Sequence, residues 1–593
     1  MVCPRVALKT KKLSGCERVA PLGRATSGRA HEKATTSHFC TRRIIHQVAI
    51  PLAPERRPFT FRRARAHAED FPMSVASLLG GRAALSGASA LAARGGLKTR
   101  KRPAAFSRTI PRASIAEPPG ASDADTDAGQ ARAKVSMVSL GCPKNTVDGE
   151  VMLGDLFSNG FDVVDDHEEA DAVIVNTCGF VEDAKNESVD AILAAAALKA
   201  ESEERGAKKK IIVTGCLAQR YAEDLAEEMP EVDVVMGFEE YKNLPGVVGD
   251  ALGVALDAAA PARPGRVRVG TASPPFRPEA LRKRLTPQHY AYLRVAEGCD
   301  HKCTFCAIPG FRGKFRSKQW DPIVEEAKAL AQTGAKELCL IAEDTNQWGM
   351  DLKASDGRGL AELLEALAAV DGVEWIRILY AYPSYFSEEL IDAIADIPEV
   401  CKYIDIPLQH ITNLSLLRMN RPPRQHTEDL LYKLRDRIPG LALRTTFISG
   451  FPGETEEEHE DLMAFCREFK FERLGAFAYS EEDGTPAAEY PDQVEQAVRD
   501  LRRDQLVAQQ QEISEAFAES RVGSTVNVVI DGFDPDLDAW TGRTMLEAPD
   551  IDPIVFVQEP APGSGVAALE QGQMRKCKIV GTSLFDLEAH VVA

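Results

Sequence analysis

The apolar positions of this chain form short runs that alternate with helix-length segments. From Lys134, three successive units repeat one order: an apolar run, a turn that contains a cysteine, and a helical pattern. The runs are Val135–Leu140, Ala172–Val175 and Ile211–Val213. Short apolar strands that alternate with helices predict a parallel α/β sheet, and right-handed crossovers bring the carboxyl ends of its strands to one edge.

A second alternation of strands and helices begins near Tyr290 and predicts a partial barrel. Its six apolar runs are Tyr292–Ala296, Glu337–Ile341, Trp375–Tyr380, Tyr403–Pro407, Leu443–Ile448 and Arg473–Tyr479. Six βα units predict a partial (β/α)6 barrel whose chemistry lies at the carboxyl ends of its strands. A polar helical stretch from Gln493 to Ser520 leads out of this barrel.

Beyond this stretch, the tail shows short β-like runs broken by Gly, Pro and Asp, at Thr525–Ile530, Ile554–Val557 and Lys576–Val580. This pattern predicts a small closed β-barrel. The fold class is therefore α/β with a β-barrel tail. The expected parts are a basic leader (1–115), a linker (116–133), an α/β domain (134–249), a proline-rich linker (250–286), the partial barrel (287–515) and the tail (516–593).

Length and composition exclude some classes of protein. A chain of 593 residues is too long for one core, because a domain usually has about 100–200 residues. No apolar run approaches the roughly 18 residues that span a bilayer, so an integral membrane protein is not expected. The 13 cysteines are too dilute for a small disulfide scaffold, which favours reduced thiolates that bind metal.

Charge is divided unevenly between the leader and the rest of the chain. Residues 1–115 contain 23 Lys and Arg but 5 Asp and Glu, although the whole chain has a net charge of −18. Residues 73–115 have no acidic residue and are rich in Ala, Ser and Gly, which is typical of an organellar transit peptide. We expect a soluble chloroplast protein, with the mitochondrion as the alternative and Met73 as a second candidate start. A basic arm that binds nucleic acid is another interpretation of the leader.

The sharpest motif is the CxxxCxxC loop made by Cys299, Cys303 and Cys306. It follows the first barrel strand, where the barrel predicts an active site. Zinc sites and ferredoxin-type clusters normally take four protein ligands, so three thiolates on a cubane cluster leave one iron free for a substrate or cofactor. The alternative is a zinc knuckle completed by His301, but His301 lies inside the loop itself.

A second set of cysteines follows the three strands of the first predicted sheet. Cys142, Cys178 and Cys216 each come directly after an apolar run, so we expect them to converge at one edge of the sheet. Singly, each could be an ordinary buried cysteine. Three at equivalent positions in consecutive units indicate a second three-thiolate cluster.

The order of these parts resembles the radical S-adenosylmethionine methylthiotransferases from about Lys134 to the C-terminus. The segment Ser139-Leu-Gly-Cys-Pro-Lys-Asn145 is similar to the RimO type, which modifies an aspartyl residue of the twelfth small-subunit ribosomal protein. The transfer-RNA-modifying MiaB type usually has Gln and Met where Pro143 and Lys144 stand. Further segments that agree with RimO are Tyr292–Cys299, Tyr403–His410, Arg418–Pro422 and Arg444–Thr455.

This resemblance implies two 4Fe–4S clusters and S-adenosylmethionine as cofactors. One cluster would cleave S-adenosylmethionine to a radical that abstracts hydrogen from the aspartyl β-carbon, and the other would supply the sulfur. Glu343 is expected to bind the amino group of the cofactor. Gly450 and Gly453 are expected to let backbone approach its adenine or ribose, with a plain turn as the alternative. No catalytic acid or base is assigned.

The resemblance also implies a reductant such as ferredoxin or flavodoxin. For the substrate, the tail from Arg521 holds 5 Lys and Arg against 11 Asp and Glu. Phosphate binding requires basic residues, so this acidic tail favours a basic ribosomal protein over nucleic acid. A merely solvated surface is the alternative for the tail. For the whole chain, the alternatives are a transfer-RNA methylthiotransferase and a non-catalytic iron–sulfur or zinc scaffold.

Overall fold

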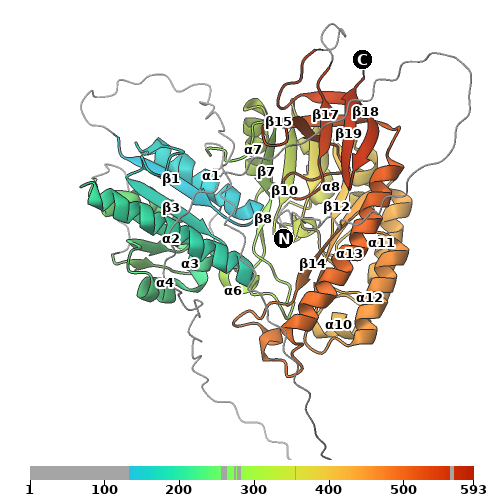
Figure 1. Cartoon of the computed structure of the whole chain (residues 1–593), viewed down its shortest axis with the longest axis horizontal. Helices are drawn as coiled ribbons and strands as arrows, with labels where there is room; N and C mark the ends of the chain where they lie inside the picture. Colours follow the sequence, from blue (N-terminus) through green and yellow to red (C-terminus); the bar gives the residue numbers. More distant parts are fainter. Residues whose placement is uncertain are drawn as a thin grey trace, which may run out of the picture. The chain divides into compact units, whose positions relative to one another are not determined.

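The first domain is built on a six-stranded parallel sheet with the strand order β2-β1-β3-β4-β5-β6 (Figure 1). The computed structural model describes residues 132–254, 264–272, 276, 282–353, 356–560 and 567–592. The predicted leader and nearly all of the first linker lie outside these residues. The strands are β1 (Lys134–Ser139), β2 (Asp162–Val163), β3 (Ala172–Thr177), β4 (Lys210–Gly215), β5 (Val234–Met236) and β6 (Val267–Arg268).

The central strands of this sheet are continuous apolar runs because helices cover the sheet. Every residue of β3 is buried, as expected for a parallel strand packed on both faces. The helices are α1 (Pro143–Ser158), α2 (Glu182–Glu204), α3 (Cys216–Arg220), α4 (Ala222–Glu228) and α5 (Leu244–Leu252), with a 3-10 turn at Phe238–Asn243.

Helix α1 joins the first domain to the barrel. Its residues Met152 and Leu156 pack against the first sheet, together with Val135 and Ile174. Val147, on another side of the helix, packs into the barrel interior with aromatic residues of the barrel strands. The helix is therefore buried on two sides, which fixes the residues at its amino-terminal end between the two sheets.

The predicted linker 250–286 needs a correction, because β6 lies within it. Val267 and Arg268 pair in parallel with Val235 and Met236 of β5 and become the sixth strand. The backbone N–H of Val235 donates to the carbonyl of Arg266 at 2.8 Å. A strand of two residues is too short to show an apolar alternation among the surrounding prolines, which is why the pattern predicted only a linker.

The second domain is a six-stranded parallel sheet with the order β14-β13-β12-β11-β10-β7, and it confirms the predicted partial barrel. Leu338 and Leu340 face the outer helices, whereas Glu337, Cys339 and Ile341 face the interior, since side chains alternate along a strand. The strands are β7 (Tyr290–Arg294), β10 (Glu337–Ile341), β11 (Trp375–Ile378), β12 (Val400–Asp405), β13 (Ala442–Ser449) and β14 (Arg473–Ala478); a short hairpin pairs β8 (Ala296–Glu297) with β9 (Arg316–Ser317).

Helices follow the barrel strands as the pattern predicts, and two of them begin with a side-chain cap. Thr455 and Glu458 form a capping box at the start of α12, and Ser387 caps α9. The helices are α6 (Ile308–Arg312), α7 (Trp320–Gln332), α8 (Leu360–Ala368), α9 (Glu388–Asp396), α10 (Asn413–Arg418), α11 (Arg424–Arg437), α12 (Glu456–Phe469) and α13 (Gln496–Ser520), with 3-10 turns at Thr345–Gln347 and Pro486–Glu489.

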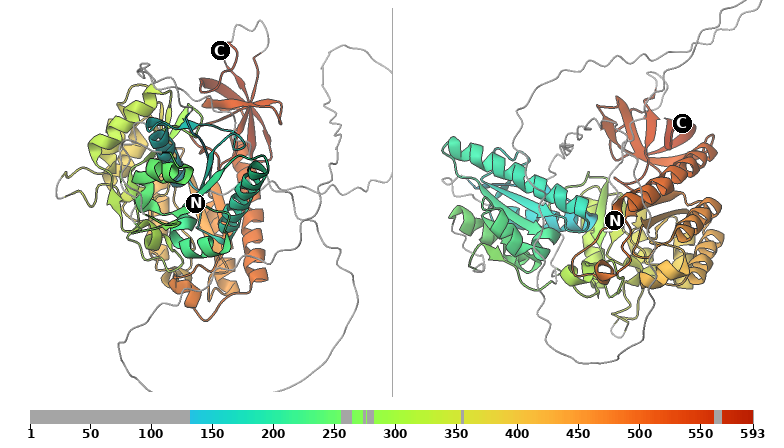
Figure 2. Two further views of the ribbon diagram at one scale, coloured as in Figure 1. Left: turned by 90° about the vertical axis from the view of Figure 1, so that its left-hand side faces the viewer. Right: turned by 60° about the horizontal axis from the view of Figure 1, so that its bottom comes forward.

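The tail is the predicted closed β-barrel, with the order β15-β16-β17-β19-β18 (Figure 2). The apolar runs predicted parts of β15, β17 and β18 but missed β16 and β19, in which apolar and polar residues are interspersed and form no apolar run. The strands are β15 (Thr525–Asp534), β16 (Ala539–Arg543), β17 (Val555–Gln558), β18 (Met574–Ser583) and β19 (Asp586–Val591).

The loop between β16 and β17 fills the amino-terminal end of the partial barrel. Ala548 packs among Tyr290, Tyr292 and Trp375, which lie at the beginnings of barrel strands. The Tyr403 hydroxyl donates to Asp552 Oδ2 at 2.7 Å. The interior of the barrel is thus closed at one end by the tail, and its carboxyl-terminal end is left for chemistry.

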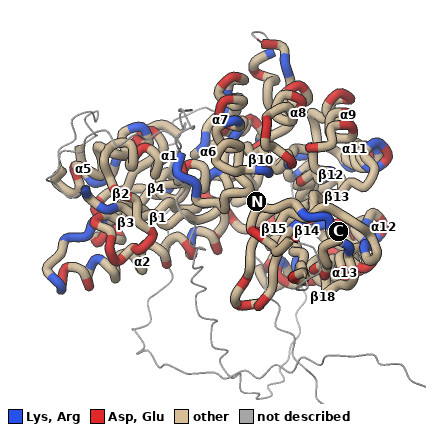
Figure 3. The backbone as a smooth tube through the Cα atoms, turned by 90° about the horizontal axis from the view of Figure 1, so that it is seen from above, with Lys and Arg blue, Asp and Glu red and all other residues tan. Residues whose placement is uncertain are grey.

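The surface of the described residues carries both signs of charge. Lys and Arg positions are interspersed with Asp and Glu positions along the helices (Figure 3). None of the helices that the structure describes combines the length and the apolar character needed to cross a membrane.

Candidate active site

The first set of cysteines lies at adjacent strand ends, as predicted. Cys142 follows β1 and is the N-cap residue of α1, Cys178 follows β3, and Cys216 follows β4 and begins α3. Because β1, β3 and β4 are neighbours in the sheet, the three thiols are brought to one edge. Cys178 and Cys216 are each 7% exposed, and Cys142 is partly exposed.

Glycines beside these cysteines allow the strand ends to approach closely. Gly141 has a φ of +85°, and a Cβ on it would lie 2.8 Å from the Sγ of Cys178. Gly215 has a φ of +95°, and a Cβ there would lie 2.3 Å from the carbonyl oxygen of Thr177. At both positions the backbone is left-handed, and the strand ends are so close together that the Cβ of any other residue would clash.

The second set of cysteines lies on the loop after β7 and β8. The backbone N–H of Cys299 donates to the carbonyl of Gly313 at 3.1 Å, and the N–H of Cys306 donates to the carbonyl of Cys303 at 3.1 Å. The residues after α10 support the loop from the other side, since Asn420 Nδ2 donates to the carbonyl of Lys302 at 2.9 Å. All three thiols are partly exposed.

His301 is engaged away from the thiols, which argues against a zinc knuckle. Its Nε2 lies 2.6 Å from Asp344 Oδ2, and its ring stacks on Tyr382 with centroids 3.6 Å apart. Within the described residues, no three Cys, His, Asp or Glu side chains are grouped so that they could hold a single metal ion. A cubane cluster has a different requirement, because each thiolate binds its own iron.

The raised pKa values of these thiols are compatible with two iron–sulfur clusters. Burial raises the pKa of Cys216 to about 11, with the neighbouring Cys142 adding to the effect. Burial likewise raises the pKa of Cys306 to about 12, and Cys303 adds to it. Burial and neighbouring cysteines also raise the pKa of Cys178 and Cys299. Thiols whose ionisation is disfavoured in this way become stable thiolates when a cation such as iron binds them.

A buried ion network lies beside the first set, and sequence reasoning missed it. Arg312, at the end of α6, donates to Cys216 Sγ at 3.6 Å, to Asp148 Oδ2 at 2.9 Å and to Glu297 Oε1 at 3.3 Å. Arg294 of β7 donates to Asp148 and to Glu297 at 2.5 and 2.6 Å. Asp148 lies on α1 and Glu297 lies two residues before Cys299. The network therefore links the two sets of cysteines.

Lys144 is a second residue whose position the sequence did not predict. It lies in the first turn of α1 and is 7% exposed. Its Nζ donates to the carbonyl of Ala342 at 3.3 Å and lies 3.7 Å from the centroid of the Tyr380 ring. Ala342 directly follows β10 and Tyr380 lies two residues after β11, so a side chain of the first domain reaches the carboxyl-terminal end of the barrel.

Glu343 lies between the contacts of Lys144 and the loop that carries Cys299, Cys303 and Cys306. Its Oε2 accepts the backbone N–H of Gly298, the residue before Cys299, at 2.9 Å. Burial and the neighbouring Glu297 raise the pKa of Glu343 to about 7 against the opposing effect of Lys144 and Arg312. The position is compatible with binding an amino group, and that role stays a prediction.

The glycine turn after β13 is accounted for by packing within the chain. Gly450 has a φ of +72°, and a Cβ on it would lie 2.4 Å from Cγ of Arg499. A Cβ on Gly453 would lie 3.3 Å from Nη1 of Arg418. Arginine side chains fill the space into which a Cβ would point at both glycines, so packing favours glycine here, and a close approach of adenine or ribose stays a prediction.

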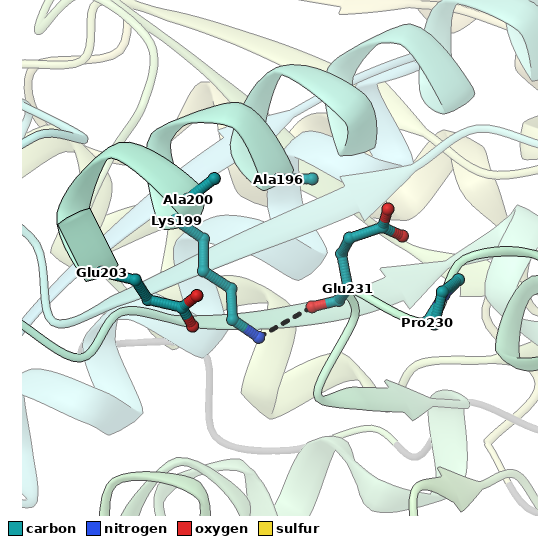
Figure 4. Close-up of a pocket in the computed structure, with 6 residues that line it drawn as sticks. All are labelled: Ala196, Lys199, Ala200, Glu203, Pro230 and Glu231. Carbon is teal, nitrogen blue, oxygen red and sulfur yellow. Dashed lines mark hydrogen bonds between the residues drawn. The ribbon is translucent and has the colours of Figure 1, made fainter.

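A shallow pocket on the first domain does not involve the cysteines. It is lined by residues of α2 and of the loop before β5, as Figure 4 shows: Ala196, Lys199, Ala200, Glu203, Pro230 and Glu231. Lys199 Nζ donates to the carbonyl of Glu231 at 2.9 Å and pairs with Asp233 at 2.7 Å. These contacts hold α2 against the sheet, and the pocket offers no group for the chemistry of the cysteines.

Three family models match the chain. Residues 134–237 match the uncharacterized protein family UPF0004, residues 293–466 match the radical SAM superfamily, and residues 522–592 match the TRAM domain. Among solved structures, the chain is similar to a radical S-adenosylmethionine methyltransferase, TsrM, from Kitasatospora setae. That match has 15% identity, covers 58% of this chain and 73% of the other, and has a TM-score of 0.41.

Curated relatives match much more of the chain. The ribosomal protein uS12 methylthiotransferase RimO of Clostridioides difficile is 42% identical over 462 residues, which are 77% of this chain and 99% of the relative. The protein of the same name from an Anaeromyxobacter species is 45% identical over 464 residues, covering 78% and 93%. The aligned length agrees with the part of the chain that begins near Lys134.

Proposed function

The chain belongs to the RimO family of radical S-adenosylmethionine methylthiotransferases, and from that premise we propose that it attaches a methylthio group to the β-carbon of an aspartyl residue in a counterpart of ribosomal protein uS12. The observation that carries the proposal is the pair of three-cysteine sets, which Asp148, Glu297 and Arg312 join through buried ion pairs. A methyltransferase or a scaffold with one cluster has no need of two such sets held together.

Six cysteines would hold the cofactors, which are S-adenosylmethionine and two 4Fe–4S clusters. When bound, the cluster on Cys299, Cys303 and Cys306 supplies reductive cleavage of S-adenosylmethionine, and the cluster on Cys142, Cys178 and Cys216 supplies the methylthio sulfur. The position of each set indicates its task. The second set lies on the loop after the first barrel strand, whereas the first set lies on the other domain.

The surrounding residues orient these thiols and exclude water. Arg421 Nη1 donates to Cys303 Sγ at 3.7 Å and stacks on Tyr382, while Arg312 donates to Cys216. N–H donors to cluster sulfurs stabilise the more negative state, so each arginine favours the reduced form of its cluster. The aromatic and aliphatic side chains of the barrel interior keep the reacting atoms away from bulk water.

The identity of the substrate is tested by mass spectrometry on cells that lack the gene. Loss of the methylthio-aspartyl form of the uS12 counterpart, with unchanged 2-methylthioadenosine in transfer RNA, is the expected result. The opposite pattern, with the aspartyl modification intact and 2-methylthioadenosine lost, would show that the substrate is transfer RNA.

We also propose that the enzyme is imported into the chloroplast, with the mitochondrion as the alternative. The support is the composition of residues 73–115, which have eight Lys and Arg and no acidic residue. A reporter fused after residue 133 is expected to reach the chloroplast. A cytosolic reporter would contradict import, and a mitochondrial one would identify the other organelle. A reductant of the ferredoxin or flavodoxin class is expected to supply the electron.

A further inference from the structure

The buried Lys144 ammonium lacks the partner that a buried charge normally has. An ammonium has three N–H donors, and the contacts of this one are a carbonyl oxygen and the face of a tyrosine ring. Within the part of the chain that the structure describes, no carboxylate forms an ion pair with its Nζ, although Lys144 and the Glu343 carboxylate interact over a greater distance. A buried charge without a counter-charge is costly, and the carboxylate of a ligand would supply the missing counter-charge.

The other fully buried cations of this region already have carboxylate partners; Arg421 has none, but it is partly exposed and donates to Cys303 Sγ and to the carbonyl of Pro407. Arg294 and Arg312 share Asp148 and Glu297, and Arg444 of β13 pairs with Asp405 at 3.2 Å. Lys144 is therefore the buried cation here that is suited to a carboxylate from outside the chain.

Lys144 also lies between the two sets of cysteines. It is two residues from Cys142, and its Nζ donates to the carbonyl of Ala342. The next residue, Glu343, accepts the backbone N–H of Gly298, which directly precedes Cys299. A substrate carbon that loses hydrogen at one set and gains sulfur from the other must pass through this region.

The ring of Tyr380 lies against the Lys144 ammonium, and Tyr380 adopts an unfavourable backbone conformation in this position. Tyr380 has a φ of +62°, an uncommon conformation for an aromatic residue, and its backbone N–H donates to Asp405 Oδ2 at 3.2 Å. Unusual backbone of this kind persists where the surroundings require a side chain to lie in one place. The ring covers one side of Nζ, and the remaining donors are left for a ligand.

We infer that Lys144 binds the side-chain carboxylate of the aspartyl substrate and so selects an aspartyl residue over a neutral one. This inference rests on the proposed function, in which the β-carbon that reacts carries that carboxylate. S-adenosylmethionine also has a carboxylate, but its expected place is the open iron of the second set. The Lys144 side chain, by contrast, comes from the helix that Cys142 caps.

The test compares aspartyl and asparaginyl versions of one peptide from the uS12 counterpart, using the anaerobically reconstituted full chain. The variants are Lys144→Met, which keeps the apolar stem, and Lys144→Arg, which keeps the charge. The matched control is Lys283→Met, because Lys283 Nζ also lies 3.7 Å from an aromatic centroid, that of Phe157. The readouts are peptide affinity by fluorescence anisotropy, methylthio product, 5′-deoxyadenosine formed without peptide, and iron content.

The wild type and the Lys283→Met protein are expected to bind and modify the aspartyl peptide about tenfold to a hundredfold better than the asparaginyl peptide. This ratio corresponds to the free energy of one hydrogen bond to a charged group. Lys144→Met is expected to lose this preference while its iron content stays at the wild-type level. Lys144→Arg is expected to retain part of the preference.

Two results would overturn the inference while leaving the proposed function in place. One is a Lys144→Met protein that still prefers the aspartyl peptide. The other is loss of peptide-free 5′-deoxyadenosine formation at normal iron content, which would assign the Lys144 contact to the carboxylate of S-adenosylmethionine. A wild type that modifies neither peptide but modifies transfer RNA would instead contradict the proposed function itself.

Discussion

Single residues in this protein connect segments that lie far apart in the sequence. Arg312 is 2% exposed and touches Cys216, which is 96 residues away, as well as Asp148 and Glu297. Such a network gives little net stability compared with apolar packing, but it fixes positions, because breaking it leaves charges buried without partners.

We predict that Arg312→Gln lowers the free energy of unfolding of the metal-free protein by about 1.5–3 kcal/mol, since Asp148 and Glu297 each lose one of two cations and keep Arg294. Urea denaturation measures this change. The matched control is Arg437→Gln, because Arg437 pairs with Glu388 and Asp392 on the exposed surface and its loss should leave stability close to that of the wild type. Equal stability of both variants would contradict the structural role of Arg312.

Glu547 predicts a pH dependence of stability. Burial by itself would raise the pKa of Glu547, but Arg521 and Arg473 outweigh it and lower the pKa from 4.5 to about 2. A lowered carboxyl pKa gives stability that is fully present above pH 4.5 and is lost as the pH falls toward 2. The Glu547→Gln protein should therefore be less stable than wild type at pH 6, and this difference should shrink below pH 4.5. A difference that is constant from pH 6 to pH 3 would show that charge is not its origin.

At the scale of elements, strand ends explain how the six cysteines could be found from the sequence. Parallel strands carry their carboxyl ends to one edge, so the position of Cys142, Cys178 and Cys216 after apolar runs was enough to predict their meeting. Arg312 and Lys144 gave no such signal, because their partners are set by how α1 packs on the barrel. Only the glycines beside the cysteines, such as Gly141, could have indicated how closely the strand ends approach.

We predict that the two sets of cysteines are separable in function. A protein with Cys142, Cys178 and Cys216 replaced by Ala should contain about four iron atoms instead of about eight, cleave S-adenosylmethionine and transfer no methylthio group. The matching variant with Ala at Cys299, Cys303 and Cys306 should also hold about half the iron but cleave no S-adenosylmethionine. Methylthio transfer by the first variant would refute the division of labour.

At the scale of the whole molecule, the acidic tail needs one correction. Asp531, one of the 11 acidic residues counted in the tail, is paired with Arg543 at 2.9 Å and with His289 at 2.8 Å, so it holds the tail on the barrel. Asp534 accepts backbone N–H groups in the turn that follows it. A sequence count of acidic residues cannot separate such internal pairs from surface charge. Asp536 and Glu588 are exposed acids of the tail.

We predict that replacing Asp536 and Glu588 with Lys lowers the association rate with the basic uS12 counterpart about tenfold at low salt and flattens its salt dependence. S-adenosylmethionine cleavage without the substrate protein should not change. The control replaces the exposed Glu201 and Glu203 of α2 with Lys, which makes the same change in net charge. An equal loss in both variants would show that total charge, and not the tail, attracts the partner.

The contact between the β16–β17 loop and the barrel has a consequence for how the chain matures during synthesis. Glu337, Arg377 and Arg473 lie inside the barrel, yet Arg543, Met545 and Glu547 complete their hydrogen bonds. These partners are translated after every strand of the barrel. The catalytic domain therefore stays unfinished until the last part of the chain leaves the ribosome, and a message truncated upstream of Arg543 yields a product with unpaired interior charges that proteases should remove.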